Sequence, residues 1–160
     1  MRNDPALFPK TLAVVRMATA CFFLLFGQYK LFSPEFTHGG FQQYLQSYAQ
    51  DSAVGLYQPI LADLVLPHAV FFGYLVGAVE FCVGICLLLG FAVRPASVVG
   101  ALHMISLTLA TWWGPGHGVP VWRYFGAELD HLPLLFLFVI FFVGDVGKVW
   151  GLDGRRRGSP

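Results

Sequence analysis

Residues 73–94 read GYLVGAVEFCVGICLLLGFAVR, a long apolar run with one acid, Glu80, near its middle. Extended back to Ala69, the run covers about 25 residues. At about 1.5 Å per residue, a helix of that length crosses a hydrocarbon core of about 30 Å. We therefore predict a membrane-spanning helix over residues 69–93. An ionisable side chain at membrane depth is costly and suggests a function.

Glu80 shares one face of this helix with Gly73, Gly77 and Gly84, because helical residues advance by about 100° each. Small residues let a second helix approach closely in lipid, so this face should turn into a helix bundle. Two roles remain open for Glu80. It is either a buried group that handles a proton or a ligand, or a structural tie between two helices.

Composition places the chain among polytopic membrane proteins. Of its 160 residues, 56% are hydrophobic and only 12% are charged, and the net charge of +1 gives no basis for nucleic-acid binding. The apolar runs are continuous rather than alternating, which indicates helices and not a β-barrel. We predict an all-α, four-helix transmembrane bundle in a single domain, with spans at about residues 11–31, 69–93, 96–113 and 132–149. The first run continues too far for a cleavable signal peptide, so we expect it to be retained.

The basic residues predict the orientation of the bundle. They gather at both termini and at the turn after the second span, whereas the connection after Lys30 has none and the third connection has only Arg123. The positive-inside rule then places both termini in the cytoplasm. The long connection, residues 32–67, contains FQQYLQSYAQ and VGLYQPILADLVL, which predict short interfacial helices over the outer mouth of the bundle. These helices form either a lid over a binding site or a simple cap.

Three further ionisable residues of the predicted spans bear on the site. Arg16 either snorkels to the interface or faces inward and binds an acid or an anionic ligand, whereas Lys30 is expected to be an interface anchor. His103 lies on a small-residue face and is either hydrogen-bonded structure or a proton relay and ligand contact. The predicted site consists of Arg16, Glu80 and His103, with Arg94 at the inner end. Glu80 and Arg16 have the catalytic roles, and all four of Arg16, Glu80, His103 and Arg94 contact the ligand.

Other chemistries have weaker support. Glu128, Asp130 and His131 are secondary candidates on the outer face, and Glu128-x-x-His131 has the spacing of a di-iron helix. Those sites need two such motifs and two further Glu residues, and the chain has only three Glu in all. No spacing motif supports zinc, so we expect no metal site.

The cysteines Cys21, Cys82 and Cys86 all fall in predicted spans, which gives no disulfide framework. They are either a redox pair or inert small hydrophobes. Cys82 and Cys86 lie on the side of their helix opposite Glu80, so they should not share a site with it.

An amphipathic, redox-active lipid such as a quinone suits a site of this kind. A quinone has an apolar body, and its carbonyl groups need a hydrogen-bond donor and a source of protons. The chain has no nucleotide fingerprint or Gly-rich phosphate loop. We therefore expect electrons to come from a partner protein or from a small sulfur substrate.

Three segments carry a family resemblance: RMATACFFLLFGQYKL (residues 16–31), VEFCVGICLLLGFAVRPAS (79–97) and FGAELDHLPLLFLFVIFFVGDVGKVWGLD (125–153). Their order resembles the DoxX family of small four-helix membrane proteins. His103 belongs to none of the family motifs. The positions that match the family pattern are Arg16, Gly27, Lys30, Glu80, Gly84, Gly90, Arg94, Glu128, Gly147 and Asp153.

The resemblance implies a subunit of a quinone-linked oxidoreductase, of the thiosulfate:quinone type in some relatives, in the bacterial cytoplasmic (inner) membrane. A redox partner protein and a homo-oligomer are both compatible with it. The alternative is a non-catalytic membrane scaffold or assembly partner of a redox complex. A small transporter is a third option, although four spans without an internal repeat form a small pathway.

Overall fold

The computed structural model describes residues 6–112 and 131–156 of the chain, and these two ranges contain helices and turns but no strand. Four helices run lengthwise, and short helical segments connect the first two. The lengthwise helices are α1 (Leu7–Phe32), α3 (Ala69–Leu89), α4 (Val93–Ala110) and α6 (His131–Val143). The short segments are η1 (Phe36–Gly40), α2 (Phe41–Ser47), η2 (Tyr48–Ser52), η3 (Ile60–Val65), η4 (Leu66–His68) and, near the C-terminus, α7 (Leu152–Arg156).

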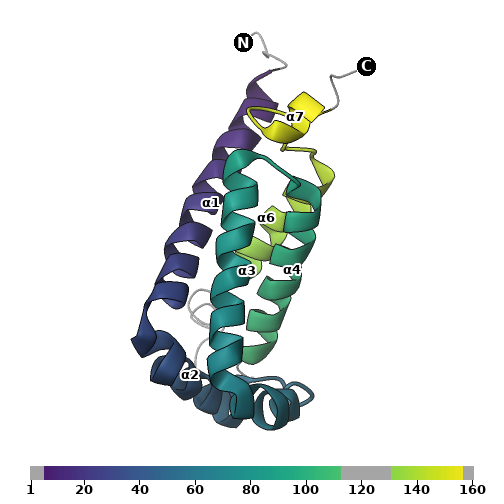
Figure 1. Cartoon of the computed structure of the whole chain (residues 1–160). Helices are drawn as coiled ribbons and strands as arrows, with labels where there is room; N and C mark the ends of the chain where they lie inside the picture. Colours follow the sequence, from purple (N-terminus) through teal and green to yellow (C-terminus); the bar gives the residue numbers. More distant parts are fainter. Residues whose placement is uncertain (1–5, 113–130, 157–160) are drawn as a thin grey trace.

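The four long helices form a bundle whose two ends differ (Figure 1). The start of α1, helix α7 and the turn between α3 and α4 lie at one end, which we call the terminal end. Helix α2 and its neighbouring segments lie across the opposite end, the loop end. Within the described residues, three helical stretches are long and apolar enough to cross a membrane: Leu7–Phe32, Ile60–Leu89 and Val93–Ala110. The predicted all-α membrane bundle is confirmed.

The fourth helix is shorter than predicted. The apolar run predicted a span over residues 132–149, but α6 ends at Val143 and has 13 described residues. Gly144 follows the last turn, and Asp145 adopts a left-handed conformation with φ of 49°. Glycine is a poor helix former and a left-handed residue ends a helix, so the backbone leaves the helix here despite the apolar residues that follow.

The turn between α3 and α4 lies earlier in the chain than the predicted spans imply. Helix α3 ends at Leu89 because Gly90, with φ of 60°, forms a left-handed C-cap. Helix α4 then begins at Val93, before the predicted residue 96, since Pro95 is tolerated in a first helical turn.

Small residues bring α1 and α3 into close contact, as the predicted glycine face required. A Cβ atom added to Gly27 would lie 2.5 Å from the backbone nitrogen of Phe81, and one added to Gly84 would lie 2.9 Å from Cγ of Leu24. A Cβ on Gly77 would lie 3.0 Å from Cβ of Lys30. This contact fixes the relative depth of the two antiparallel helices, and it places Lys30 within one helical turn of Glu80.

Two apolar cores stabilise the molecule. The larger lies among the four long helices, where Phe138 packs edge-on to Phe23 and occupies the space beside Gly100. The smaller lies at the loop end, where residues of α2, η3 and the chain between them pack on the start of α3 and the end of α4. The connection is therefore a folded cap that is packed on the bundle. Its core residues are Leu45, Ala53, Leu61, Ala69 and Ala110.

Candidate functional site

The polar centre of the bundle is Glu80, which joins three helices. Lys30 Nζ, in the last turn of α1, donates a hydrogen bond to Glu80 Oε1 at 2.5 Å. His103 Nε2, on α4, lies 3.0 Å from the same oxygen. The side chains of Glu80 and His103 are only 6% and 9% exposed, and that of Lys30 is 19% exposed. A buried carboxylate is thus held by one cation and one imidazole.

The hydrogen-bond pattern assigns the roles of the ring nitrogens of His103. Because the Glu80 carboxylate beside Lys30 accepts, His103 Nε2 carries the proton. Nδ1 is then the polar ring atom left for another partner. The second carboxylate oxygen, Glu80 Oε2, is buried and makes no hydrogen bond with any described residue. The centre therefore has capacity for a ligand or a water molecule.

His103 also lines a pocket of about 310 Å³ between the loop-end cap and helices α3 and α4. Its polar groups include His103, Tyr57 and Ser106, and the hydroxyl groups of Tyr57 and Ser106 lie 2.6 Å apart. A mostly apolar cavity with a few convergent polar groups is typical of a small-molecule site. The lining residues are Phe41, Leu45, Tyr48, Tyr57, Leu61, Val65, Phe72, Leu75, Val76, Val79, Val99, His103, Ser106, Leu107 and Ala110.

Arg16 does not join this centre, contrary to the predicted site. It is fully buried at the terminal end, where Nη2 donates to the backbone oxygen of Trp150 at 3.1 Å. Its Nη1 is so close to Gly90 that a Cβ atom there would lie 2.1 Å away. Gly90 and Glu80 are ten residues apart on one helical path, which corresponds to about 15 Å. Arg16 therefore faces inward, as one of its two predicted interpretations required. Its contacts, however, are with residues at the terminal end and not with Glu80.

The predictions for Lys30 and Arg16 were both wrong with respect to Glu80, because Lys30 occupies the place beside Glu80 that was expected for Arg16. Lys30 was expected to be an interface anchor, and Arg16 was expected to share the site with Glu80. Instead Lys30 forms the ion pair with Glu80. The glycine contacts between α1 and α3 set this choice, because they align the last turn of α1 with the middle of α3.

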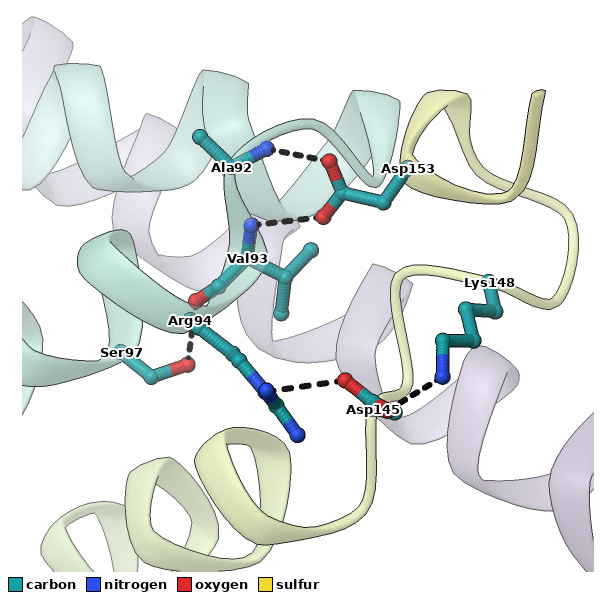
Figure 2. Close-up of polar contacts among 7 residues, drawn as sticks. All are labelled: Ala92, Val93, Arg94, Ser97, Asp145, Lys148 and Asp153. Atoms are coloured by element: carbon teal, nitrogen blue, oxygen red, sulfur yellow. Dashed lines mark hydrogen bonds and ion pairs between the residues drawn. The ribbon is translucent and has the colours of Figure 1, made fainter. Parts of the chain in front are cut away.

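Arg94 lies at the terminal end as well, in a set of contacts with the C-terminal segment (Figure 2). Arg94 Nε is 2.9 Å from Asp145 Oδ1, and Lys148 pairs with the other oxygen of the same carboxylate. The Arg94 side chain is 49% exposed. The structure thus places Arg94 in a surface ion-pair group and does not bring it to Glu80.

Asp153 fastens the C-terminal segment to the α3–α4 turn. Its two carboxylate oxygens accept hydrogen bonds from the backbone N–H groups of Ala92 and Val93, at 2.8 and 2.9 Å (Figure 2). Its own N–H donates to the carbonyl oxygen of Gly90 at 2.9 Å. A carboxylate at this position satisfies the free amides at the start of α4 and complements the helix dipole.

The remaining candidates are the residues predicted on the outer face and the cysteines. Glu128 and Asp130 lie outside the described residues, and His131 is the first residue of α6. Among the residues that the structure describes, no group of three His, Cys, Asp or Glu side chains is placed to hold a metal ion. Cys82 is exposed and Cys86 is half-buried, whereas Glu80 is buried, so the predicted separation of these cysteines from Glu80 is confirmed.

Sequence reasoning missed Lys30, Tyr57 and Ser106 as members of the site. A signal for Lys30 existed, because it continues the stripe of α1 that contains Arg16 and Gly27. No comparable signal marked Tyr57 and Ser106. They are 49 positions apart and meet only when the loop-end cap packs on α4.

Comparison with known proteins places the chain in a family. The family model for DoxX matches residues 11–113, which include Lys30, Glu80, Tyr57 and His103 but end before the third of the quoted segments. Comparisons with curated proteins and with solved structures find no match. The match covers more than half of the chain, and the fold is the membrane bundle expected of this family. This multi-pass membrane protein therefore belongs to the DoxX family.

Proposed function

We propose that this protein is the membrane subunit of a quinone-linked oxidoreductase and that it binds a quinone head group in the pocket beside His103. One observation carries the proposal. His103 stands in the wall of an apolar pocket of about 310 Å³ while its Nε2 is held by the buried Lys30–Glu80 pair. An imidazole fixed in this way can act on a carbonyl oxygen in an otherwise apolar cavity.

A bound quinone would supply the two-electron redox chemistry and would need two protons for its reduction. His103 Nδ1 would accept or donate a hydrogen bond at one head-group oxygen and, when the ring is protonated, would deliver a proton to it. The Glu80 carboxylate stabilises the positive charge on the ring, and Lys30 neutralises the carboxylate when the ring is neutral. The Tyr57–Ser106 hydroxyl pair offers a second donor within the same pocket. Electrons would come from a partner protein or a small reduced sulfur compound.

The proposed setting is the bacterial cytoplasmic membrane with both termini in the cytoplasm. Two observations support it: the start of α1 and helix α7 lie at one end of the bundle (Figure 1), and the basic residues of the sequence gather near both termini and at the turn after α3. In this orientation the loop end and the His103 pocket are on the periplasmic side.

The test is quinone content after purification in mild detergent. Mass spectrometry of the lipid extract should detect a quinone with the wild-type protein and about tenfold less with His103→Ala, because the substitution removes the polar anchor of the head group. His68→Ala is the matched control, since His68 is an exposed histidine of η4 outside the pocket and should retain the quinone. Extracts that contain phospholipid but no quinone in all three samples would contradict the proposal.

A non-catalytic scaffold is the second candidate. The observation that favours it is the Lys30–Glu80 ion pair, which ties α1 to α3 whether or not a ligand is present. The scaffold interpretation predicts that Glu80→Gln lowers thermal stability in detergent while no preparation of the protein contains a redox lipid. It also predicts that a partner protein, and no quinone, co-purifies with the chain.

A further inference from the structure

A second hollow lies on the same side of the bundle, between α3 and α4 on the terminal side of the His103 pocket. We call it the α3–α4 groove. It has a volume of about 380 Å³, and its wall consists of aliphatic side chains and two cysteines. Cys82 is exposed and Val99 is 43% exposed, so the groove opens toward the surrounding membrane. Its lining residues are Ala78, Val79, Cys82, Val83, Cys86, Ala92, Pro95, Ala96 and Val99.

The groove and the His103 pocket are continuous. Val79 on α3 and Val99 on α4 line both of them. His103 lies one helical turn from Val99 toward the loop end. Ala96 lies about one turn from Val99 in the other direction, toward the terminal end. From Ala110 to Ala96 the combined cleft follows α4 over a rise of about 21 Å.

We infer that the α3–α4 groove binds the isoprenoid tail of the quinone whose head group lies beside His103. This inference rests on the proposed function. The polar groups are confined to the loop-end part of the cleft, and the remainder of the described wall has no hydrogen-bonding group stronger than a thiol. That division matches a ligand with a small polar head and a long apolar tail.

The lining of the head-group pocket argues against a phospholipid as the natural occupant of the cleft. A phospholipid would bring a phosphate to the head-group pocket, and the described lining of that pocket contains no Lys or Arg. Lys30, the cation of the nearby polar centre, is already paired with Glu80. A quinone head group carries no charge and needs only hydrogen bonds, which His103 and the Tyr57–Ser106 pair can provide.

Site-specific alkylation tests the inference on the unmodified protein. Purified protein in detergent is treated with a maleimide, and the rate of labelling at each cysteine is followed by peptide mass spectrometry. A quinone with a long isoprenoid tail should slow the labelling of Cys82, whereas a quinone with the same head group and a single isoprene unit should not. Cys21, an exposed cysteine on α1 outside the groove, is the internal control and should react at the same rate throughout.

A paired substitution provides an independent readout. Cys82→Trp fills the groove and should weaken binding of the long-tailed quinone by about tenfold, the size of an ordinary overpacking penalty, while binding of the short-tailed quinone is unchanged. Ile85→Trp is the matched control because Ile85 is an exposed residue of α3 outside both hollows, and it should affect neither ligand. Binding is measured as quinone retained on immobilised protein over a concentration series.

The outcomes separate the two proposals. If Cys82→Trp binds both quinones as tightly as the wild type does and the long tail leaves Cys82 labelling in the wild type unchanged, the groove is not the tail site, although head-group binding stands. If phospholipid alone slows Cys82 labelling as strongly as the long-tailed quinone, the groove is a general lipid site and the inference fails. If neither quinone binds the wild-type protein, the proposed function itself fails.

Discussion

At the scale of single residues, the molecule is organised by one buried carboxylate. Glu80 receives Lys30 from α1 and His103 from α4 on the same oxygen, and its second oxygen makes no hydrogen bond with a described residue. A buried ion pair contributes little net stability, since desolvation of both charges offsets their attraction. Breaking it is costly, however, because an uncompensated charge is left behind.

Glu80→Gln should therefore destabilise the protein. Lys30 would lose its counter-ion, and we expect a loss of about 1–3 kcal/mol, below the usual penalty for a buried pair because the partly exposed lysine can extend toward water. The measurement is the thermal unfolding midpoint in detergent. Glu35→Gln, at an exposed glutamate, is the control.

A second variant separates charge from packing. Lys30→Met combined with Glu80→Gln removes both charges and should recover part of the lost stability, which a double-mutant cycle would quantify. Equal unfolding midpoints for Glu80→Gln and the wild type would show that the ion pair does not hold α1 to α3.

At the scale of elements, the C-terminal segment acts as a strap across the terminal end. Asp153 caps α4, and the carbonyl group of Trp150 accepts from buried Arg16. The described non-glycine residues with positive φ are Ala92, Asp145 and Trp150, and all three lie in this region. Such conformations cost of order 1–3 kcal/mol each and persist only where surrounding contacts hold them. The strap is therefore the strained part of the described fold.

Loss of the Asp153 carboxylate should release the C-terminal segment from the α3–α4 turn. Asp153→Ala leaves the amides of Ala92 and Val93 without their acceptor and should lower stability by about 1–2 kcal/mol. Limited proteolysis should then cleave the chain after Lys148 or Arg155 faster than in the wild type. Asp63→Ala, at an exposed aspartate of η3, is the control for loss of a carboxylate. An unchanged cleavage rate in Asp153→Ala would mean that other contacts suffice to hold the segment.

At the scale of the whole molecule, the two ends of the bundle have different characters. The loop end has a folded apolar cap over the His103 pocket, whereas the terminal end has the ion pairs of Arg94, Asp145 and Lys148. A pocket at one end and a charged turn at the other mean that orientation in the membrane decides which compartment can supply protons to His103.

The proposed orientation makes a direct prediction. In a variant that lacks the three native cysteines, Gly55→Cys at the loop end should react with a membrane-impermeant maleimide in intact bacterial cells. Both chosen positions are open, because Gly55 has no atom within 4 Å of an added Cβ and Arg155 is exposed. Arg155→Cys should react only after lysis, because the terminal end is expected in the cytoplasm. The reverse pattern would invert the proposed topology.

Local sequence patterns were sufficient to predict the membrane helices, the inward orientation of the Glu80 face, and the placement of Cys82 and Cys86 on the other side of that helix. Continuous apolar runs dictate helices in lipid, and glycine spacing marks the face that meets another helix. These properties depend on neighbours within one or two turns, so they can be read from residues 69–93 without knowledge of the rest of the chain.

The ion-pair partner of Glu80 could not be predicted from local sequence patterns. Lys30 and Glu80 are 50 positions apart, and both Lys30 and Arg16 lie on the inward stripe of α1. The choice between them depends on how far α1 slides along α3, which the contacts of Gly27, Gly77 and Gly84 determine. The pocket of Tyr57, His103 and Ser106 likewise exists only after the cap packs on α4. Helix formation is a local property, whereas helix depth and the closure of a cavity are set by packing between segments distant in sequence.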